Sequence, residues 1–204
     1  MIVIDELKCI KKAARGDCHA FETLVVQYQS QVYNLCLRMT GNPDDAADVA
    51  QEAFLKVWKH LDSFHFDSSF STWLYRLASN CCLDFLRSQK RRPTVSLTVE
   101  NEDEEEQVLD IADTAPTPEE RTIAHEEKEQ LRMAMSQLDD EQRQILTLRV
   151  VNDLSYSEIA DILEVKEGTV KSRLSRAREN LRKKLLDIGN KSAHAASKHQ
   201  RGGT

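Results

Sequence analysis

Apolar residues recur three or four positions apart over most of this chain, which is the spacing of helices with one buried face. Residues 154–186 show it most clearly, as two consecutive stretches. Ser155 and Glu158 form a capping box at the start of the first. Gly168 predicts a tight turn at 166–168, and Thr169 is the expected cap of the second helix. The apolar positions of the two stretches are Ile159, Ile162 and Leu163, then Val170, Leu174, Ala177, Leu181 and Leu185.

The first 92 residues show the same spacing, and strand-like alternation is nearly absent from the chain. Gly41 is a typical helix stop, and Asn42-Pro43 places a cap and a proline at the start of the next helix. The predicted helices span residues 4–14, 17–41, 43–60 and 72–91. On pattern alone, the polar face of the third helix, which includes Asp48 and Glu52, is expected to be solvated.

A break at residues 61–71 separates the third and fourth predicted helices and is rich in aromatic and hydroxyl side chains. Phe64, Phe66 and Phe70 are either buried within a folded loop or line a pocket for a stacked base. The residue pattern leaves both interpretations open.

The predicted fold is all-α, with two small helical domains joined by an acidic flexible linker. Residues 93–118 contain an acidic run with little to bury, and their prolines stop any helix. We therefore expect an N-terminal module at 1–92, a linker at 93–118, a C-terminal module at 119–188 and a disordered polar tail at 189–204.

Charge is strongly segregated along the chain, which has 204 residues and a net charge of −6. Residues 100–129 hold 13 acids and two bases, so the rest of the chain sums to +5. Residues 166–204 hold 11 Lys or Arg and three acids. An acidic middle between basic modules suits a nucleic-acid binder whose linker does not touch the nucleic acid.

Several function classes find no support in the sequence. The five cysteines have no metal-binding spacing, and their odd number without a signal peptide fits reduced thiols in a cytoplasm. A redox role for the adjacent Cys81 and Cys82 stays open. We find no phosphate-binding glycine loop and no nucleophile–base set, so neither catalysis, a metal nor a cofactor is expected. The longest apolar runs are too short to span a membrane.

The second helix of the 154–186 stretch has the composition of a DNA-recognition helix. Between its apolar positions, residues 171–178 carry Lys, Arg and Ser and no acid. Cations attract phosphates, and Arg and Ser also reach base edges in the major groove. A solvated basic face is the alternative, and the capping box and turn favour DNA binding.

Three segments together resemble the bacterial extracytoplasmic-function (group 4) sigma factors. They are DVAQEAFLKVWKHLDSF at 48–64, FSTWLYRLASNCCLDFLRSQKRR at 70–92 and LSYSEIADILEVKEGTVKSRLSRARENL at 154–181, in family order. The resemblance covers roughly residues 5–188. It implies that the modules are sigma regions 2 and 4, that the chain itself catalyses nothing, and that it directs RNA polymerase core to promoters.

The resemblance also implies a role for particular residues of region 2, and it replaces the solvated-face interpretation of the third helix. That face corresponds to the segment that docks on the clamp helices of the polymerase β′ subunit. The loop that follows corresponds to the part that captures a flipped base of the melted −10 element. The polymerase residues are Asp48, Gln51, Glu52, Leu55 and Lys56. The −10 residues are Lys56, Asp62, Phe64, His65, Phe66, Asp67, Ser68, Thr72, Arg76, Asn80 and Arg87.

For region 4, the resemblance implies readout of duplex −35 DNA. Lys171, Ser172, Ser175 and Arg176 are implied to meet bases. Phosphate contacts are implied for Arg149, Tyr156, Arg173 and Arg178. The implied partners are RNA polymerase core, through its β′ clamp helices and β subunit, promoter DNA and an anti-sigma factor. The competing hypothesis is a helix-turn-helix regulator that does not associate with polymerase core; it leaves residues 48–92 unexplained.

Overall fold

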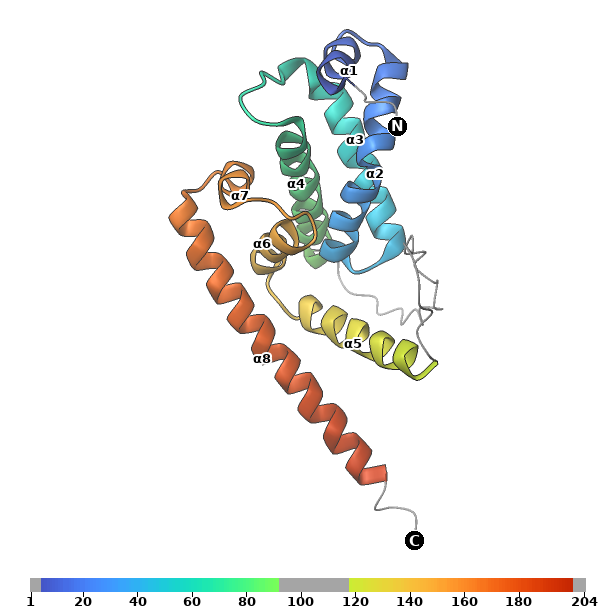
Figure 1. The fold of residues 1–204 in the computed structure, drawn as a ribbon, viewed down its shortest axis with the longest axis vertical. Coiled ribbons are helices and arrows are strands. Elements are labelled where there is room, and N and C mark those ends of the chain that lie inside the picture. Colours follow the sequence, from blue (N-terminus) through green and yellow to red (C-terminus); the bar gives the residue numbers. More distant parts are fainter. Residues whose placement is uncertain (1–4, 92–117, 200–204) are drawn as a thin grey trace.

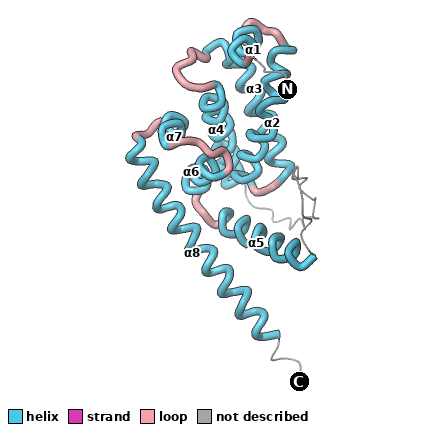
Figure 2. Tube along the Cα trace, in the orientation of Figure 1, coloured by secondary structure: helices cyan, strands magenta, loops and turns pink. Residues whose placement is uncertain are grey.

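A computed structural model describes residues 5–91 and 118–199 of the chain, and every regular element within them is helical (Figures 1 and 2). This confirms the predicted all-α class. The N-terminal module contains α1 (Glu6–Ala13), α2 (Cys18–Thr40), α3 (Pro43–His60), the 3-10 turn η1 (Leu61–Ser63) and α4 (Phe70–Arg91). The C-terminal module contains α5 (Pro118–Ser136), α6 (Asp140–Val150), α7 (Tyr156–Leu163) and α8 (Glu167–His199).

Short-range signals set the helix ends of the N-terminal module. The Asp17 carboxylate accepts a hydrogen bond from the Ala20 amide at the start of α2. Gly41 ends α2 with a φ of +77°, a conformation that a side chain disfavours. Asn42 then caps α3 through the Asp45 amide, with Pro43 at the first turn. The apolar faces of α2, α3 and α4 meet in one core, and its fully buried members include Leu24, Val32, Leu35, Met39, Val49, Val57 and Leu74.

The helix-turn-helix forms, but its turn differs from the prediction. Ser155 and Glu158 make the predicted capping box at the start of α7. The left-handed residue of the turn is Glu164, at a φ of +53°, and Gly168 lies inside α8 without a positive φ. The expected cap is also wrong: α8 begins at Glu167, two residues before Thr169. The apolar pattern could not separate these registers, because residues 164–168 carry only one apolar side chain.

The last helix continues beyond the expected module boundary. We expected a disordered tail from residue 189, whereas α8 runs to His199. No proline interrupts this segment, and one internal glycine lowers helix stability by only about 1 kcal/mol. Figure 1 shows the far half of α8 projecting away from the rest of the chain. The predicted linker, residues 93–118, lies outside the described residues except for Pro118.

The two modules pack against each other. Helices α2 and α4 of the N-terminal module contact α6 and α7 of the C-terminal module (Figures 1 and 2). Buried apolar side chains of both modules form one continuous cluster. Among the described residues, no helix is long and apolar enough to cross a bilayer, and no group of three or more potential ligands could hold a metal ion.

Candidate polymerase and promoter interfaces

The face of α3 implied for polymerase binding is open to solvent. Asp48, Gln51, Glu52 and Leu55 are all exposed, and Leu55 shows 54% of its surface. Lys56 is half-buried, and its ammonium lies 2.8 Å from the Glu52 carboxylate. The opposite face supplies Ala46, Val49, Ala53 and Val57 to the core, so burial orients the polar face outward. The face is therefore free for a partner, although a single exposed leucine does not by itself mark an interface.

The loop between α3 and α4 separates its aromatic residues into two groups. Phe64 and Phe70 are buried, at 7% and 4% exposure, and both stack against Trp73. Phe66 is 46% exposed and adopts a φ of +62°, which is rare for a bulky residue. The Lys11 ammonium lies 6.0 Å from the Phe66 ring centroid. Phe64 and Phe70 are therefore buried within a folded loop, whereas Phe66 is the exposed ring of the three, with a strained backbone of the kind that concentrates at functional sites.

Thr72 organises the loop from a buried position. It is 3% exposed, and its hydroxyl lies 2.7 Å from the Ser69 hydroxyl, which also accepts a hydrogen bond from the Thr72 amide. Asp62, His65 and Asp67 are exposed and Ser68 is half-buried. The implied −10 residues thus divide into exposed or half-buried groups able to touch DNA and two buried ones, Phe64 and Thr72, that position the loop.

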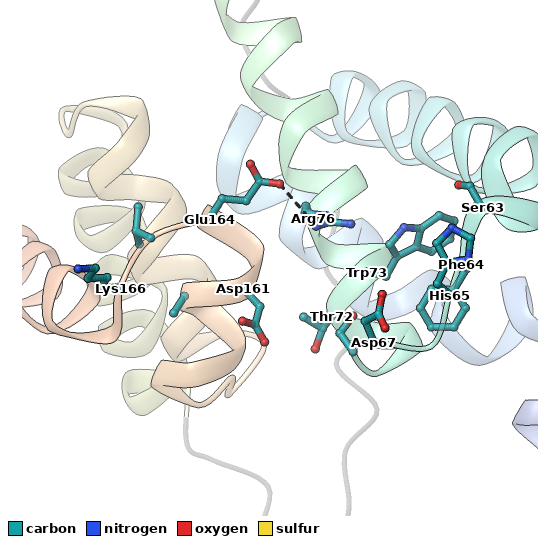
Figure 3. A pocket seen from close by; sticks show the side chains of 13 residues that line it. Ser63, Phe64, His65, Asp67, Thr72, Trp73, Arg76, Asp161, Glu164 and Lys166 are labelled. Atoms are coloured by element: carbon teal, nitrogen blue, oxygen red, sulfur yellow. Dashed lines mark ion pairs between the residues drawn. The ribbon is translucent and has the colours of Figure 1, made fainter.

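Polar residues of α4 extend the same surface. Arg76, Asn80 and Arg87 are spaced by four and seven residues, which places them along one side of the helix. Asn80 and Arg87 are exposed, and Arg87 lies 3.5 Å from the Asp84 carboxylate. Arg76 instead lies 3.5 Å from Glu164 of the C-terminal module (Figure 3). The loop, the start of α4 and the turn after α7 together enclose an open cavity of about 650 Å³.

The recognition helix α8 presents its implied base-reading residues outward. Lys171, Ser172, Ser175 and Arg176 are exposed, while Val170, Leu174 and Ala177 are buried. The Ser172 hydroxyl donates to the Thr169 carbonyl, so it must rotate to meet a base. This arrangement has the polarity that major-groove readout needs, with bases met by one side of a helix whose other side is core.

The implied phosphate contacts gather around Tyr156, at the start of α7. The Arg149 guanidinium and the Lys171 ammonium lie 5.6 and 5.9 Å from the Tyr156 ring centroid. Arg149 also donates to the Leu154 carbonyl and the Asp153 carboxylate, which holds its side chain. Arg178 lines a shallow depression together with Tyr156 and Lys171. Arg173 differs: it is half-buried and lies 3.7 Å from Glu141, so it must leave this carboxylate to reach a phosphate.

The adjacent cysteines of α4 lie in the hydrophobic core. Cys81 and Cys82 are both buried, and the Cys82 sulfur lies 3.6 Å from the sulfur of Cys36 on α2. The hydrogen bond with Cys36 and burial raise the pKa of the Cys82 thiol, and burial raises the pKa of Cys81. Thiols kept protonated in an apolar core are poor nucleophiles. The proximity of Cys36 was not predictable from the sequence, because the two thiols are 46 residues apart.

Two further residues escaped the sequence analysis. Arg143 of α6 is only 8% exposed, and burial lowers its pKa. Glu164 was assigned to no site, yet it forms an ion pair with Arg76 across the two modules. Arg143 lies in the polar run of residues 139–144, just before the apolar residues that begin at Ile145, so the sequence carried no signal of its burial.

Comparisons with known proteins agree with this geometry. Residues 24–92 match the family described as Sigma-70 region 2, and residues 128–181 match Sigma-70, region 4. The chain is 38% identical to the ECF RNA polymerase sigma factor SigW of Bacillus subtilis, over 89% of this chain and 97% of that protein. It is also 38% identical to the ECF RNA polymerase sigma-E factor of Escherichia coli K12, over 88% and 93%.

A solved structure resembles the whole arrangement. The structure of CnrH in complex with the cytosolic domain of CnrY has a TM-score of 0.64 and 25% identity, and the match covers 90% of this chain and 97% of CnrH. The fold and the exposed basic recognition helix define a two-domain, all-helical DNA-binding protein. Within that class, the chain belongs to the extracytoplasmic-function RNA polymerase sigma factors and acts in promoter-specific transcription initiation.

Proposed function

We propose that the chain performs initiation through three separate surfaces, each with its own task. The exposed face of α3 binds polymerase core, the loop at 61–72 with the exposed side of α4 captures melted −10 DNA, and α8 reads the −35 duplex. The observation that carries this division is the location of the exposed groups. Asp48 and Glu52 lie on α3, His65 and Asp67 line the loop cavity, and Lys171 and Arg176 lie on α8.

The chemistry of the −10 step follows from the loop. A base must leave the duplex stack before its edge can be read, which costs a few kcal/mol. Stacking on an aromatic ring returns about 1–3 kcal/mol per base, and Phe66 is the exposed ring of the loop. His65 and Asp67, also exposed, supply hydrogen-bonding groups next to that ring. The cost is met more easily once polymerase and the −35 contacts already hold the DNA.

The −35 step uses cations for affinity and base edges for discrimination. Arg149 and Arg178 lie beside Tyr156 and form a basic surface suited to phosphates, next to the base-reading Lys171. Arg176 and Ser175, one turn along α8, are placed to meet bases. The chain itself contributes binding and orientation, and the polymerase contributes the chemistry, so the proposal assigns no catalytic residue and places the protein in the cytoplasm with the polymerase.

An anti-sigma factor is the proposed third partner. The support is that a sigma factor of similar fold, RpoE of Bartonella quintana, was solved in complex with the anti-sigma factor NepR. Such a partner would act by covering one of the surfaces above.

The decisive experiment is run-off transcription with purified polymerase core on a library of promoter sequences. The expected result is transcription from a subset of templates that share a −35 and a −10 element. A variant with Asp48→Lys and Glu52→Lys serves as the matched negative control, because its DNA-reading surfaces are unchanged. Specific DNA binding without any dependence on core would instead favour the helix-turn-helix regulator that acts without polymerase.

A further inference from the structure

One side of α1 and the turn after it carries a row of cations, which we call the α1 basic stripe. Its members are all exposed and are spaced three, four and seven residues from the first, which places them along one side of a helix. They are Lys8, Lys11, Lys12 and Arg15. The opposite side of α1 supplies Ile10 and Ala13 to the core, so burial turns the cations outward.

The stability of α1 does not explain this stripe. Like charges three and four residues apart destabilise a helix, and Lys8 lies in the first turn, where the helix dipole disfavours a cation. Within residues 5–91 and 118–199, no carboxylate forms an ion pair with any of the four side chains. The stripe is therefore an uncompensated positive surface, as a binding site for anions requires.

The α1 basic stripe lies next to the loop between α3 and α4, at the same end of the N-terminal module (Figure 1). The Lys11 ammonium lies 6.0 Å from the centroid of the Phe66 ring. That ring is 46% exposed, and its backbone has a φ of +62°. The cations of α1 and the exposed ring of the loop thus form one continuous surface, although they are distant in the sequence.

The aromatic cluster that anchors the loop also holds α1. The Tyr28 hydroxyl of α2 donates a hydrogen bond to the Glu6 carboxylate of α1. The Tyr28 ring meets Phe70 edge-on, with the ring centroids 5.5 Å apart, and Phe70 packs against Phe64 and Trp73. Helix and loop therefore share one support, and the core fixes where the cations lie relative to the loop.

We propose that the α1 basic stripe binds the phosphate backbone of the melted DNA strand, next to the base that stacks on Phe66. Lys11 serves both parts, because its ammonium faces the ring and neutralises the adjacent phosphate. Lys8, Lys12 and Arg15 bind the neighbouring phosphates. Cations along the backbone beside an aromatic ring hold single strands irrespective of sequence. The inference rests on the proposed role of residues 61–72 and adds affinity there, not discrimination between bases.

The first test measures binding of the full chain to a fluorescein-labelled oligothymidine of about 20 nucleotides, longer than the site of a typical single-strand-binding fold. Lys8→Gln with Lys12→Gln removes two cations of the stripe. Arg38→Gln with Lys128→Gln is the matched control, since both residues are exposed cations outside the proposed surfaces. Fluorescence anisotropy at several salt concentrations gives the affinity and its salt dependence for each variant.

The stripe variant should bind the oligothymidine at least about fivefold more weakly than the parent at low salt. The slope of log affinity against log salt concentration should fall in magnitude by about 1.4, because each phosphate contact with a single strand contributes about 0.7. The control variant should keep a slope closer to that of the parent. Equal affinities and equal slopes for the two variants would overturn the proposal.

The second test concerns Lys11 and its charge. Lys11→Arg keeps a cation beside Phe66, whereas Lys11→Met keeps an unbranched side chain without the charge. Lys11→Met should weaken oligothymidine binding by about threefold or more, and Lys11→Arg should restore most of that loss. The loss should be smaller in a chain that already carries Phe66→Ala, because neighbouring groups that hold one ligand are not additive. Equal losses for the two Lys11 variants, or strict additivity with Phe66→Ala, would contradict the role given to Lys11.

Holoenzyme tests whether the stripe serves melted DNA in particular. On a pre-melted promoter template the Lys8→Gln, Lys12→Gln variant should dissociate faster than the control variant, and on a duplex −35 fragment the two should bind alike. Weaker binding of polymerase core with unchanged oligothymidine binding would overturn the proposal and assign the stripe to the polymerase. The oligothymidine assay contains neither polymerase nor promoter, so its failure leaves the proposed function standing. Conversely, a stripe that binds oligothymidine in a chain that yields no run-off transcript would contradict the proposed function alone.

Discussion

The rings of Phe64 and Phe66 lie 4.7 Å apart, yet Phe64 is buried and Phe66 is 46% exposed. Two aromatic residues of one loop thus differ in burial. The buried ring joins Phe70 and Trp73 in anchoring the loop. The exposed ring belongs to a residue with an unusual backbone conformation, at a φ of +62°, and it packs on Phe64 on one side only. This contrast provides a matched pair of variants.

Phe66→Ala should leave the fold intact and impair promoter opening. The loss of a stacking surface should cost about 1–3 kcal/mol of open-complex stability. The backbone strain at the positive φ of this position is the same for alanine as for phenylalanine, so it should not change the stability of the fold. Phe64→Ala should instead destabilise the N-terminal module by about 3–5 kcal/mol, as large core truncations do. Thermal unfolding and permanganate reactivity of promoter thymines measure the two effects. A large drop in melting temperature for Phe66→Ala would mean that its ring is structural.

Arg143→Met should destabilise the chain by about 2–4 kcal/mol, because four buried or partly buried carbonyls lose a charged donor. Arg132→Met is the control: Arg132 is exposed and bonded to Glu129 one turn earlier in α5. Its loss should cost no more than about 1 kcal/mol. Urea unfolding followed by circular dichroism gives both values. Equal losses of unfolding free energy in the two variants would show that the buried guanidinium stabilises the chain no more than an exposed one.

The sequence predicted the elements well because their signals are local. The caps at Asn42 and Ser155, the stop at Gly41 and the helical spacing of apolar residues each act within a few positions. The turn after α7 was misplaced because a left-handed Glu164 has no sequence signature comparable to glycine. The α3 face was assigned only through family resemblance, since an exposed polar face looks the same whether or not a partner covers it.

What no local pattern contains is the pairing of distant residues. Arg143 meets a carbonyl that is 104 positions away, and Cys82 meets Cys36 from another helix. Both contacts depend on how two helices cross, which is settled by the packing of the whole core. The same holds for Glu164, whose ion pair with Arg76 requires the two modules to pack together. Contacts between modules are therefore the part of this structure that sequence reasoning could not supply.

Reversing charge on α3 should separate polymerase binding from folding. Asp48 and Glu52 are exposed, so Asp48→Lys with Glu52→Lys should weaken core binding at least about tenfold while the melting temperature hardly changes. The reversal also breaks the Glu52–Lys56 pair, an exposed contact of small energetic value. Glu22→Lys with Asp187→Lys reverses the same number of exposed acids elsewhere. A titration of labelled core in which both variants bind like the parent would remove the α3 face from the interface.

The cations of α8 should differ in how their loss affects DNA binding. Arg176→Ala should cost about 1–3 kcal/mol on the preferred −35 sequence and flatten discrimination between sequences. Arg178→Ala, beside Tyr156, should weaken all sequences alike and lower the salt dependence by about one ion. Binding isotherms of holoenzyme on several −35 variants at several salt concentrations distinguish the two patterns. A sequence-independent loss for Arg176→Ala would make it a phosphate contact.

Asn80 should act only after the DNA has melted. Its side chain is exposed on α4, one turn beyond Arg76, and far in sequence from the recognition helix. Asn80→Ala should therefore leave closed-complex binding unchanged and reduce the fraction of open complex on duplex templates. A template with a pre-melted bubble should recover part of this loss, because polymerase no longer has to unpair the strands.

Discrimination at the flipped base should stay poor on the pre-melted template, since the missing amide cannot be replaced by melting. Filter binding and permanganate reactivity on both template types measure the two steps separately. Ser30→Ala, an exposed substitution on α2 outside the proposed surfaces, provides the reference. If Asn80→Ala instead lost affinity for fully duplex −35 DNA, the assignment of melted and duplex DNA to different modules would be wrong, because α4 would then contribute before melting.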